Sequence, residues 1–288
     1  MGPVKMIKTT QTDFDAIVIG SGISGGYAAM ELCTKGYKTL VLERGRAVAH
    51  GEYPTATMDP WELPHEDRVP QAEIATHYHK QDRLPWWVRQ ANKHWINKDD
   101  EYPYQEDERF DWIRGHHTGG RSLMWGRQCY RWSDIDFEAN KKDGIAIDWP
   151  IRYNDLAPWY DRVERFIGVA GSQEGIPHLP DGIFQPPMPL TCVEKDLQTM
   201  VGAVHAEARL IPARQAHLTE PTEEQLALGR GSCQYRNMCS RGCPYGAYFS
   251  SQSATIPAAK KTNNLTILTH AVVKEVVYDD QKQKAVGV

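Results

Sequence analysis

A short apolar segment followed by closely spaced glycines restricts the fold of this chain more than any other feature. Residues 15–20 read DAIVIG, which predicts a fully buried strand that ends in glycine. Residues 22–36 carry apolar side chains at helical spacing before a glycine stop, and residues 38–43, KTLVLE, predict a second buried strand. Strand, helix and strand in about 30 residues form one βαβ unit, so the two strands are expected to be parallel.

The glycines between the first strand and the helix fit the pattern G-x-G-x-x-G of dinucleotide-binding folds. Gly20 would permit the tight turn, Gly22 the close approach of backbone to a pyrophosphate, and Gly25 the packing of helix on strand. The phosphates would then meet the N–H groups of the helix N-terminus, at Ile23 and Ser24. The motif predicts a bound dinucleotide and leaves FAD and NAD open.

An acidic residue at the end of the second strand supports this interpretation. Glu43 lies about 20 residues after the motif, where a carboxylate accepts hydrogen bonds from the adenosine ribose hydroxyls. Arg44, which follows it, is assigned to the same binding region. A carboxylate favours a free 2′-hydroxyl over a 2′-phosphate, which speaks against NADP.

Later segments carry weaker patterns. Residues 149–171 predict an amphipathic helix with Pro158 near its start, and residues 193–209 predict another helix. Residues 265–268 and 272–277 are expected to be strands. A polar turn then leads to a last extended segment, as in a hairpin.

Composition excludes several classes of function. With 33 Lys and Arg against 37 Asp and Glu, the net charge of −4 offers no basic face for nucleic acid. No apolar stretch of about 18 residues occurs, so no membrane-spanning helix is expected. The segment Met1 to Gln11 is polar and lacks an apolar run of 7 to 15 residues, so it is not expected to be a secretory signal peptide.

A second glycine cluster, GHHTGGRSLMWG at residues 115–126, would let backbone lie against something large and flat. This segment resembles the Gly-Gly-x-Ser segment of the glucose-methanol-choline (GMC) oxidoreductases, which holds the pyrophosphate and flanks the isoalloxazine. DFDAIVIGSGISGG and LVLERG are similar to the family's FAD fingerprint, and THAVVKEV to the strand whose backbone meets adenine. WPIRYNDLAPWYDRVERFIGVAG resembles a segment of its bacterial sugar-oxidising, pyranose-oxidase-like branch. The resemblance implies FAD contacts at Gly119, Gly120, Ser122, Met124, Trp125, Gly126 and Val273.

The resemblance implies an α/β fold with a parallel sheet and an inserted α+β substrate domain, incomplete without a C-terminal half. The FAD-binding domain would be discontinuous, at residues 13–50, 110–148 and 250–288. Residues 51–109, rich in Pro and Trp without a lasting period, would form an excursion over it. Residues 149–249 would begin the substrate or cap domain and contain the cysteine-rich loop.

The implied reaction is oxidation of a sugar or glycoside hydroxyl, with C3 of a glycoside as the specific expectation, by hydride transfer to flavin N5. Met124 stands where some relatives carry a His joined to the flavin, which predicts noncovalent FAD. The family's catalytic His, with a His or Asn beside it, lies in a C-terminal half that this chain does not contain, so the required base is missing. His116 and His117 could line a site, although solvated loop histidines are favoured. A noncatalytic flavin or electron-transfer module, an oxygen-using oxidase and an NAD-linked dehydrogenase are the alternatives.

Three cysteines crowd into eleven residues, at Cys233, Cys239 and Cys243, the last followed by proline. Such a run predicts iron–sulfur ligation, and three ligands suit a 3Fe-4S cluster. Some bacterial GMC sugar dehydrogenases carry a similar triplet ending Cys-Pro-x-Gly-Ala. A zinc site, a disulfide with a spare thiol and three ordinary buried cysteines remain open; zinc would need a fourth ligand, and no histidine lies between His217 and His270.

A cluster would pass electrons one at a time to an external acceptor, such as a cytochrome. The related dehydrogenases are similar to catalytic subunits exported with a small partner that bears a twin-arginine signal, which implies the periplasm, with the cytoplasm as the alternative. The remaining cysteines, Cys33, Cys129 and Cys192, are expected to be structural.

Overall fold

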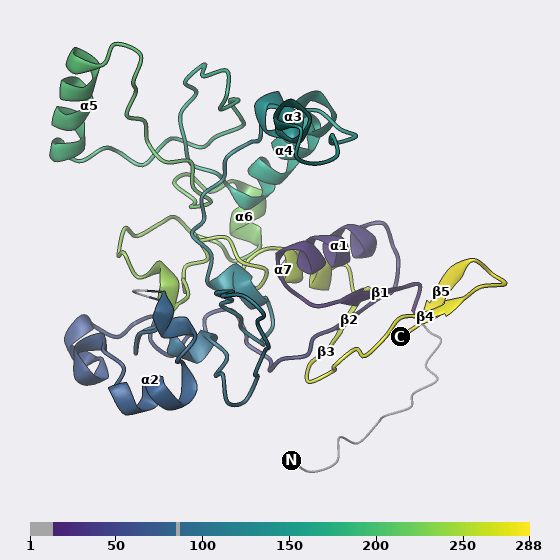
Figure 1. Ribbon diagram of the computed structural model, residues 1–288. Helices are drawn as coiled ribbons and strands as arrows, with labels where there is room; N and C mark the ends of the chain where they lie inside the picture. Colours follow the sequence, from purple (N-terminus) through teal and green to yellow (C-terminus); the bar gives the residue numbers. More distant parts are fainter. Residues whose placement is uncertain (1–13, 85–86) are drawn as a thin grey trace.

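A computed structural model of the chain describes residues 14–84 and 87–288 (Figure 1). The expectation for Met1 to Gln11 therefore concerns residues outside the described ranges. Within those ranges no helix is both long and apolar enough to cross a membrane.

The core of the fold is a parallel sheet with the predicted βαβ unit. Strands β1 (Ala16–Ile19), β2 (Thr39–Leu42) and β3 (Leu265–Leu268) are adjacent in that order, and both pairs are parallel. Helix α1 (Ile23–Thr34) connects β1 to β2. The predicted α/β class is thus confirmed, and the sheet joins the two ends of the sequence.

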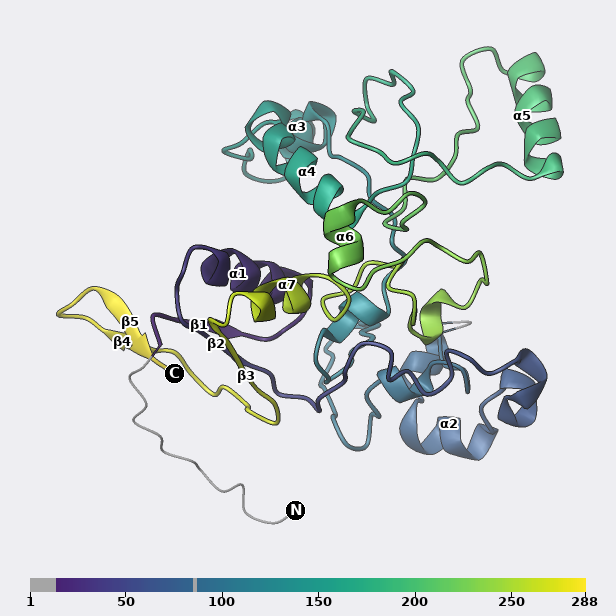
Figure 2. The ribbon, with the colours of Figure 1, turned by 180° about the vertical axis from the view of Figure 1, so that it is seen from behind.

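Helix α7 (Thr255–Lys261) packs beside α1 on one face of the sheet, as Figures 1 and 2 show from opposite sides. The close approach depends on Gly26 of α1. A Cβ atom there would lie 2.5 Å from the Oγ1 atom of Thr255 and 2.9 Å from the Oγ atom of Ser251. A larger residue would push the two helices apart.

The expectation that the first strand is fully buried is wrong. Ile17 and Ile19 of β1 are 38% and 53% exposed, and Leu268 of β3 is 49% exposed. The reason is that β1 lies at the edge of the sheet and both packed helices cover the same face within the described chain.

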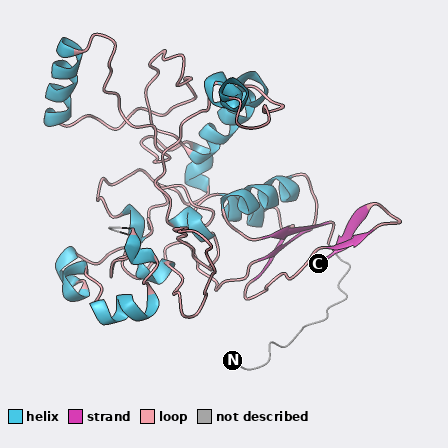
Figure 3. Cartoon of the chain, viewed as in Figure 1, coloured by secondary structure: helices cyan, strands magenta, loops and turns pink. Residues whose placement is uncertain are grey.

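The other elements are separated by long loops, which predominate in Figure 3. The remaining helices and strands are α2 (Gln71–His77), α3 (Asp134–Asp143), α4 (Tyr153–Ile167), α5 (Cys192–Val204), α6 (Glu223–Ala227), β4 (Val277–Asp279) and β5 (Lys284–Gly287). Single 3-10 turns occur at Pro60–Glu62, Pro64–Asp67, Gln81–Arg83, Lys93–Trp95, Gly120–Leu123 and Cys239–Arg241.

Two predicted helices differ at their ends. Helix α4 begins at Tyr153, so Pro158 is inside the helix rather than near its start. The start is set by Asp155, whose carboxylate accepts the Arg152 N–H at 2.8 Å, as in a capping box. Helix α5 ends at Val204, earlier than expected, and projects away from the sheet (Figures 1 and 2).

The predicted strand at residues 272–277 is wrong for all but its last residue. The N–H of Ala271 still donates to the Glu43 carbonyl at 2.9 Å, which extends the edge of the sheet. The chain then runs without a strand partner until Val277, where β4 pairs with β5 in the expected antiparallel hairpin. Apolar β-branched residues alone could not show that no neighbouring strand meets this segment.

We expect Gly25→Ala to destabilise the fold by about 1–3 kcal/mol, because the new Cβ atom would collide with the Gly20 carbonyl oxygen. Gly202→Ala in α5 is the matched control, since a Cβ atom there meets open space and helical Gly costs about 0.5–1 kcal/mol relative to Ala. Urea unfolding of both variants measures the difference. Equal stability of the two variants would contradict the packing argument.

Candidate functional site

The structure brings the two glycine clusters together. A Cβ atom on Gly120 would lie 3.8 Å from the Cα atom of Gly22, so the two backbones face each other closely. The N–H of Gly119 donates to the Ser21 hydroxyl at 2.9 Å. Segments about one hundred positions apart in the sequence therefore form one site beside the N-terminus of α1.

The first glycine cluster has the shape that a diphosphate requires. Gly20 has a φ of +87°, a left-handed conformation suited to glycine, and a Cβ atom on Gly22 would meet open space. No side chain caps α1, and its first turn, with half-buried Ile23 and exposed Ser24, contains no acidic residue. The helix N-terminus is thus available for anionic groups, as a dinucleotide phosphate requires.

Glu43 is placed beside this cluster and is 6% exposed. Its Oε2 atom accepts the Ser21 N–H at 3.0 Å and the Ser21 hydroxyl at 2.6 Å, and its Oε1 atom accepts the Gly45 N–H at 2.9 Å. Three charge-assisted hydrogen bonds hold the carboxylate in a single position. Sequence reasoning missed Ser21, which occupies a variable position of the motif; its small hydroxyl side chain was the available signal.

A cavity of about 300 Å³ opens at the carboxyl ends of β2 and β3. Its walls include Arg44 and Gly45 after β2, His270 after β3, His116 from the second glycine cluster, and Asn97 from the 51–109 segment. In parallel sheets, ligands bind at this end of the strands. The long segment between the glycine clusters therefore contributes to the candidate site.

The cavity is positively charged, and several of its polar atoms lack protein partners. Arg44 lies over the Tyr102 ring and Arg46 over the Trp95 ring, and neither guanidinium forms an ion pair with a described residue. The Nδ2 atom of Asn97, a residue 7% exposed, has no hydrogen-bond partner among the residues that the structure describes. Unpaired buried donors of this kind are rare unless a ligand or water pairs with them.

Three histidines of the cavity, His94, His116 and His117, have a pKa below the usual value. Burial lowers the pKa of His94 to about 4, with a further contribution from Arg46. Burial and Arg44 lower the pKa of His116 to about 4 as well. Burial also lowers the pKa of His117, which is 2% exposed, so the expectation of a solvated loop histidine is wrong there. Each neutral ring can both donate and accept a hydrogen bond.

The remaining residues of the second glycine cluster contact two different parts of the chain, the segment before α7 and the 51–109 segment. The Ser122 hydroxyl accepts the Ser251 N–H at 3.0 Å, which fixes the cluster to the segment before α7. The Trp125 indole donates to the Phe249 carbonyl at 3.0 Å, and its ring packs with Ile23 in one apolar cluster. Met124 is half-buried and packs instead beside the 51–109 segment.

The other two predicted cofactor residues are Gly126 and Val273. Gly126 is exposed, and a Cβ atom there would meet open space. Val273 is half-buried and lies two residues beyond Ala271, whose N–H donates to the Glu43 carbonyl. Val273 thus follows, two residues later, the backbone that is hydrogen-bonded to Glu43.

The three clustered cysteines lie on one loop as free, half-buried thiols. Burial raises the pKa of the Cys239 thiol, and the neighbouring Cys233 and Cys243 contribute, so the three sulfurs are electrostatic neighbours. The Nε2 atom of His217 lies 3.9 Å from the Cys239 Sγ atom, a proximity that sequence reasoning missed because a gap of 22 residues separates them.

Burial lowers the pKa of His217 to about 4, with a further contribution from Arg127. In the described ranges no three His, Cys, Asp or Glu side chains are arranged to hold a single metal ion. Of the other cysteines, Cys33 is buried in α1 as expected and Cys129 is half-buried, whereas Cys192 is exposed at the start of α5.

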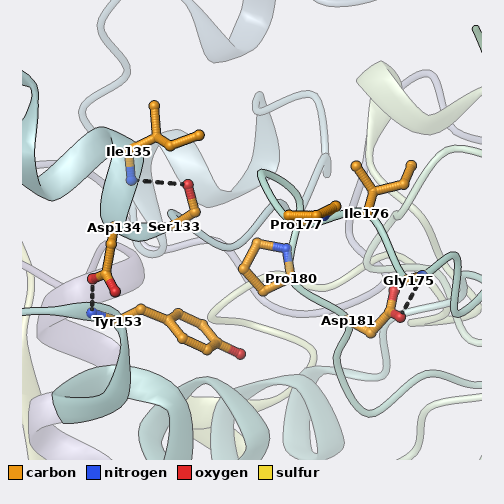
Figure 4. A pocket seen from close by; sticks show the side chains of 9 residues that line it. All are labelled: Ser133, Asp134, Ile135, Tyr153, Gly175, Ile176, Pro177, Pro180 and Asp181. Carbon is orange, nitrogen blue, oxygen red and sulfur yellow. Dashed lines mark hydrogen bonds between the residues drawn. The ribbon is translucent and has the colours of Figure 1, made fainter. Parts of the chain in front are cut away.

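A second cavity, of about 390 Å³, lies between α3, α4 and the loop at residues 175–181 (Figure 4). Its carboxylates are already engaged. Asp134 accepts the Tyr153 N–H at 2.8 Å, and Asp181 accepts the Gly175 N–H at 2.8 Å. Both carboxylates therefore serve to hold the ends of the helix and of the loop in place, and we assign no ligand to this cavity.

Acid should destabilise the protein as pH falls from about 6.5 to about 4. In that range the unfolded chain protonates histidines that stay neutral in the fold, including His94 and His116. The free energy of unfolding should be independent of these groups above pH 6.5 and decrease below it. Urea unfolding at a series of pH values measures the slope, which His94→Gln should reduce; an unchanged slope would contradict the assignment.

Comparison with known proteins relates this geometry to a family. The fructose dehydrogenase large subunit of Gluconobacter japonicus is 26% identical over 269 residues, which cover 90% of this chain and 45% of that protein. Paromamine 6'-oxidase of Streptomyces fradiae is 25% identical over 278 residues, covering 95% and 43%. The solved pyridoxine 4-oxidase from Mesorbium loti aligns with a TM-score of 0.48 at 14% identity, covering 92% of this chain and 44% of its own.

The chain spans less than half the length of these curated relatives. The GMC oxidoreductase family model matches residues 14–288, which include both glycine clusters, Glu43 and the cysteine loop. The match covers nearly the whole chain and agrees with the parallel sheet and the facing glycines. This chain belongs to the GMC oxidoreductases.

Proposed function

We propose that this chain binds FAD noncovalently across the two facing glycine clusters. The observation that carries the proposal is the approach of Gly120 to Gly22 beside an uncapped helix N-terminus, with open space at Gly22. The diphosphate would lie against the N–H groups at Ile23 and Ser24. Family membership supports FAD over NAD.

Other residues would hold the two ends of the cofactor. Glu43 would accept a ribose hydroxyl, and the backbone at Val273 would meet the adenine. Arg44 and the uncommitted polar atoms of the 300 Å³ cavity would surround the adenosine end. The predicted contacts of the isoalloxazine side are Gly119, Ser122, Met124, Trp125 and Gly126.

The reaction is proposed to be oxidation of a sugar or glycoside hydroxyl, with C3 of a glycoside as the specific candidate. Bound FAD supplies the hydride acceptor at N5. The substrate hydroxyl must lose its proton to a base as its carbon loses the hydride, and we assign no described residue to that role. The relatives named a fructose dehydrogenase and a paromamine oxidase support a sugar-like alcohol as the substrate.

We assign the FAD-binding domain to residues 13–50, 110–148 and 250–288, with residues 51–109 as an excursion over that domain and residues 149–249 as the start of the substrate or cap domain. The three strands of the parallel sheet and both glycine clusters lie in the ranges of the FAD-binding domain, which supports this assignment of domains. Lys93–Trp95 line the 300 Å³ cavity, which supports the place given to residues 51–109.

Electrons are proposed to leave the flavin through a 3Fe-4S cluster on Cys233, Cys239 and Cys243. Three free, half-buried thiols within eleven residues support this proposal. The acceptor would be an external cytochrome.

A small partner subunit bearing a twin-arginine signal would place the enzyme in the periplasm, and without such a partner it would act in the cytoplasm. The fructose dehydrogenase relative is a large subunit, which supports an assembly of this chain with other subunits.

Purified protein should be yellow, or should take up added FAD, and acid precipitation should release the flavin into the filtrate. Colour retained in the precipitate would contradict noncovalent binding, and a protein that takes up no FAD would refute the function. Anaerobic addition of sugars then separates the alternatives. Bleaching by a sugar supports the dehydrogenase, while reduction only by a protein donor supports an electron-transfer module.

We expect Glu43→Gln to raise the Kd for FAD by about tenfold, because a neutral amide accepts hydrogen bonds less strongly than a carboxylate. Glu138→Gln is the control, since Glu138 lies in exposed surface ion pairs. Titration of apoprotein by flavin fluorescence measures both values. A Glu43→Gln variant with the wild-type Kd would remove the assigned role.

Iron analysis tests the cluster. We expect about three iron atoms per chain in protein purified without oxygen, and loss of this iron in Cys239→Ser. Cys192→Ser, at an exposed position, should keep the iron. Protein without iron would end the cluster hypothesis and leave an oxygen-using oxidase as the alternative.

A further inference from the structure

We propose that Ser21 is a positioning residue for the cofactor site, and this inference rests on the proposed binding of FAD. The Ser21 side chain fixes the Glu43 carboxylate and joins it to the second glycine cluster. The Ser21 hydroxyl thus links the turn after β1 to the second glycine cluster, which backbone bonds of Arg46 with His116 and Thr118 also connect to the segment after β2.

The geometry of Ser21 has three parts. Its N–H and its hydroxyl both donate to the Glu43 Oε2 atom, at 3.0 and 2.6 Å. Its oxygen accepts the Gly119 N–H at 2.9 Å. Because Ser21 is 1% exposed, no water competes for these bonds, and a hydroxyl is the smallest side chain that can donate and accept at once.

The Gly119 N–H uses the Ser21 hydroxyl as its acceptor in a closely packed environment. Its φ is +81°, and the Gln252 side chain packs so closely that a Cβ atom on Gly119 would collide with it. Gly119 is itself buried. Removing the Ser21 hydroxyl would take the acceptor away from a buried N–H, and the Oε1 atom of Gln252, which has no hydrogen-bond partner among the described residues, would have to move to replace it.

The same bonds decide what Glu43 can still accept. A carboxylate offers about four lone-pair positions, and the chain occupies three of them. Two of these bonds are on Oε2 and one is on Oε1, so the spare capacity is on Oε1. Ser21 therefore limits Glu43 to about one ribose hydroxyl and determines which oxygen takes it.

The test is Ser21→Ala, with Ser253→Ala as the matched control. Ser253 is also a buried serine with hydrogen bonds, but its partners lie at Tyr248 and Ser250, not at Glu43 or Gly119. We expect Ser21→Ala to raise the Kd for FAD about tenfold, measured by quenching of flavin fluorescence on titration of the apoprotein. Ser253→Ala should lower the Tm similarly and leave this Kd unchanged.

Ser21→Thr, which keeps the hydroxyl, should bind FAD more tightly than Ser21→Ala. The inference is overturned if Ser21→Ala binds FAD as the wild type does, or if Ser21→Ala and Ser253→Ala weaken binding equally. Wild-type protein that binds no FAD would instead refute the proposed function, so the two failures are distinguishable.

Discussion

The buried Glu43 carboxylate and its hydrogen bonds are the constraint on which the organisation of this protein depends. A charge this poorly exposed is tolerated only when donors replace the lost water. Here the donors come from the turn after β1 and from Gly45 after β2. Ser21 extends the network to Gly119, so one carboxylate joins the βαβ unit to a segment far along the chain.

The position of the second glycine cluster then determines how the segment between β2 and that cluster must run. Residues 51–109 leave the sheet and return, and they form a wall of the cavity at the carboxyl ends of β2 and β3. Arg44 and Arg46 give this region positive charge without ion-pair partners among the described residues. The same charge and the burial keep the neighbouring histidines neutral.

The cysteine loop is linked to this site through packed aromatic groups. The ring centroids of Trp125 and Tyr248 are 6.4 Å apart, as are those of Tyr248 and His217. The His217 ring approaches Cys239 in turn, and the Tyr248 hydroxyl donates to the Trp125 carbonyl at 3.2 Å. The second glycine cluster and the thiols thus belong to one contiguous region of the structure.

The sequence by itself determined the βαβ unit, the glycine turn, the acidic residue and the family, because these depend on local periodicity and on short spacings along the chain. Only the tertiary structure decided that Gly120 faces Gly22, that Ser21 bonds to Glu43 and Gly119, and that His217 lies beside Cys239, since each contact joins residues that no local pattern relates. The same reason explains the exposed side of β1 and the missing strand after Ala271. Burial and strand pairing depend on which neighbours the fold supplies, and apolar composition does not specify them.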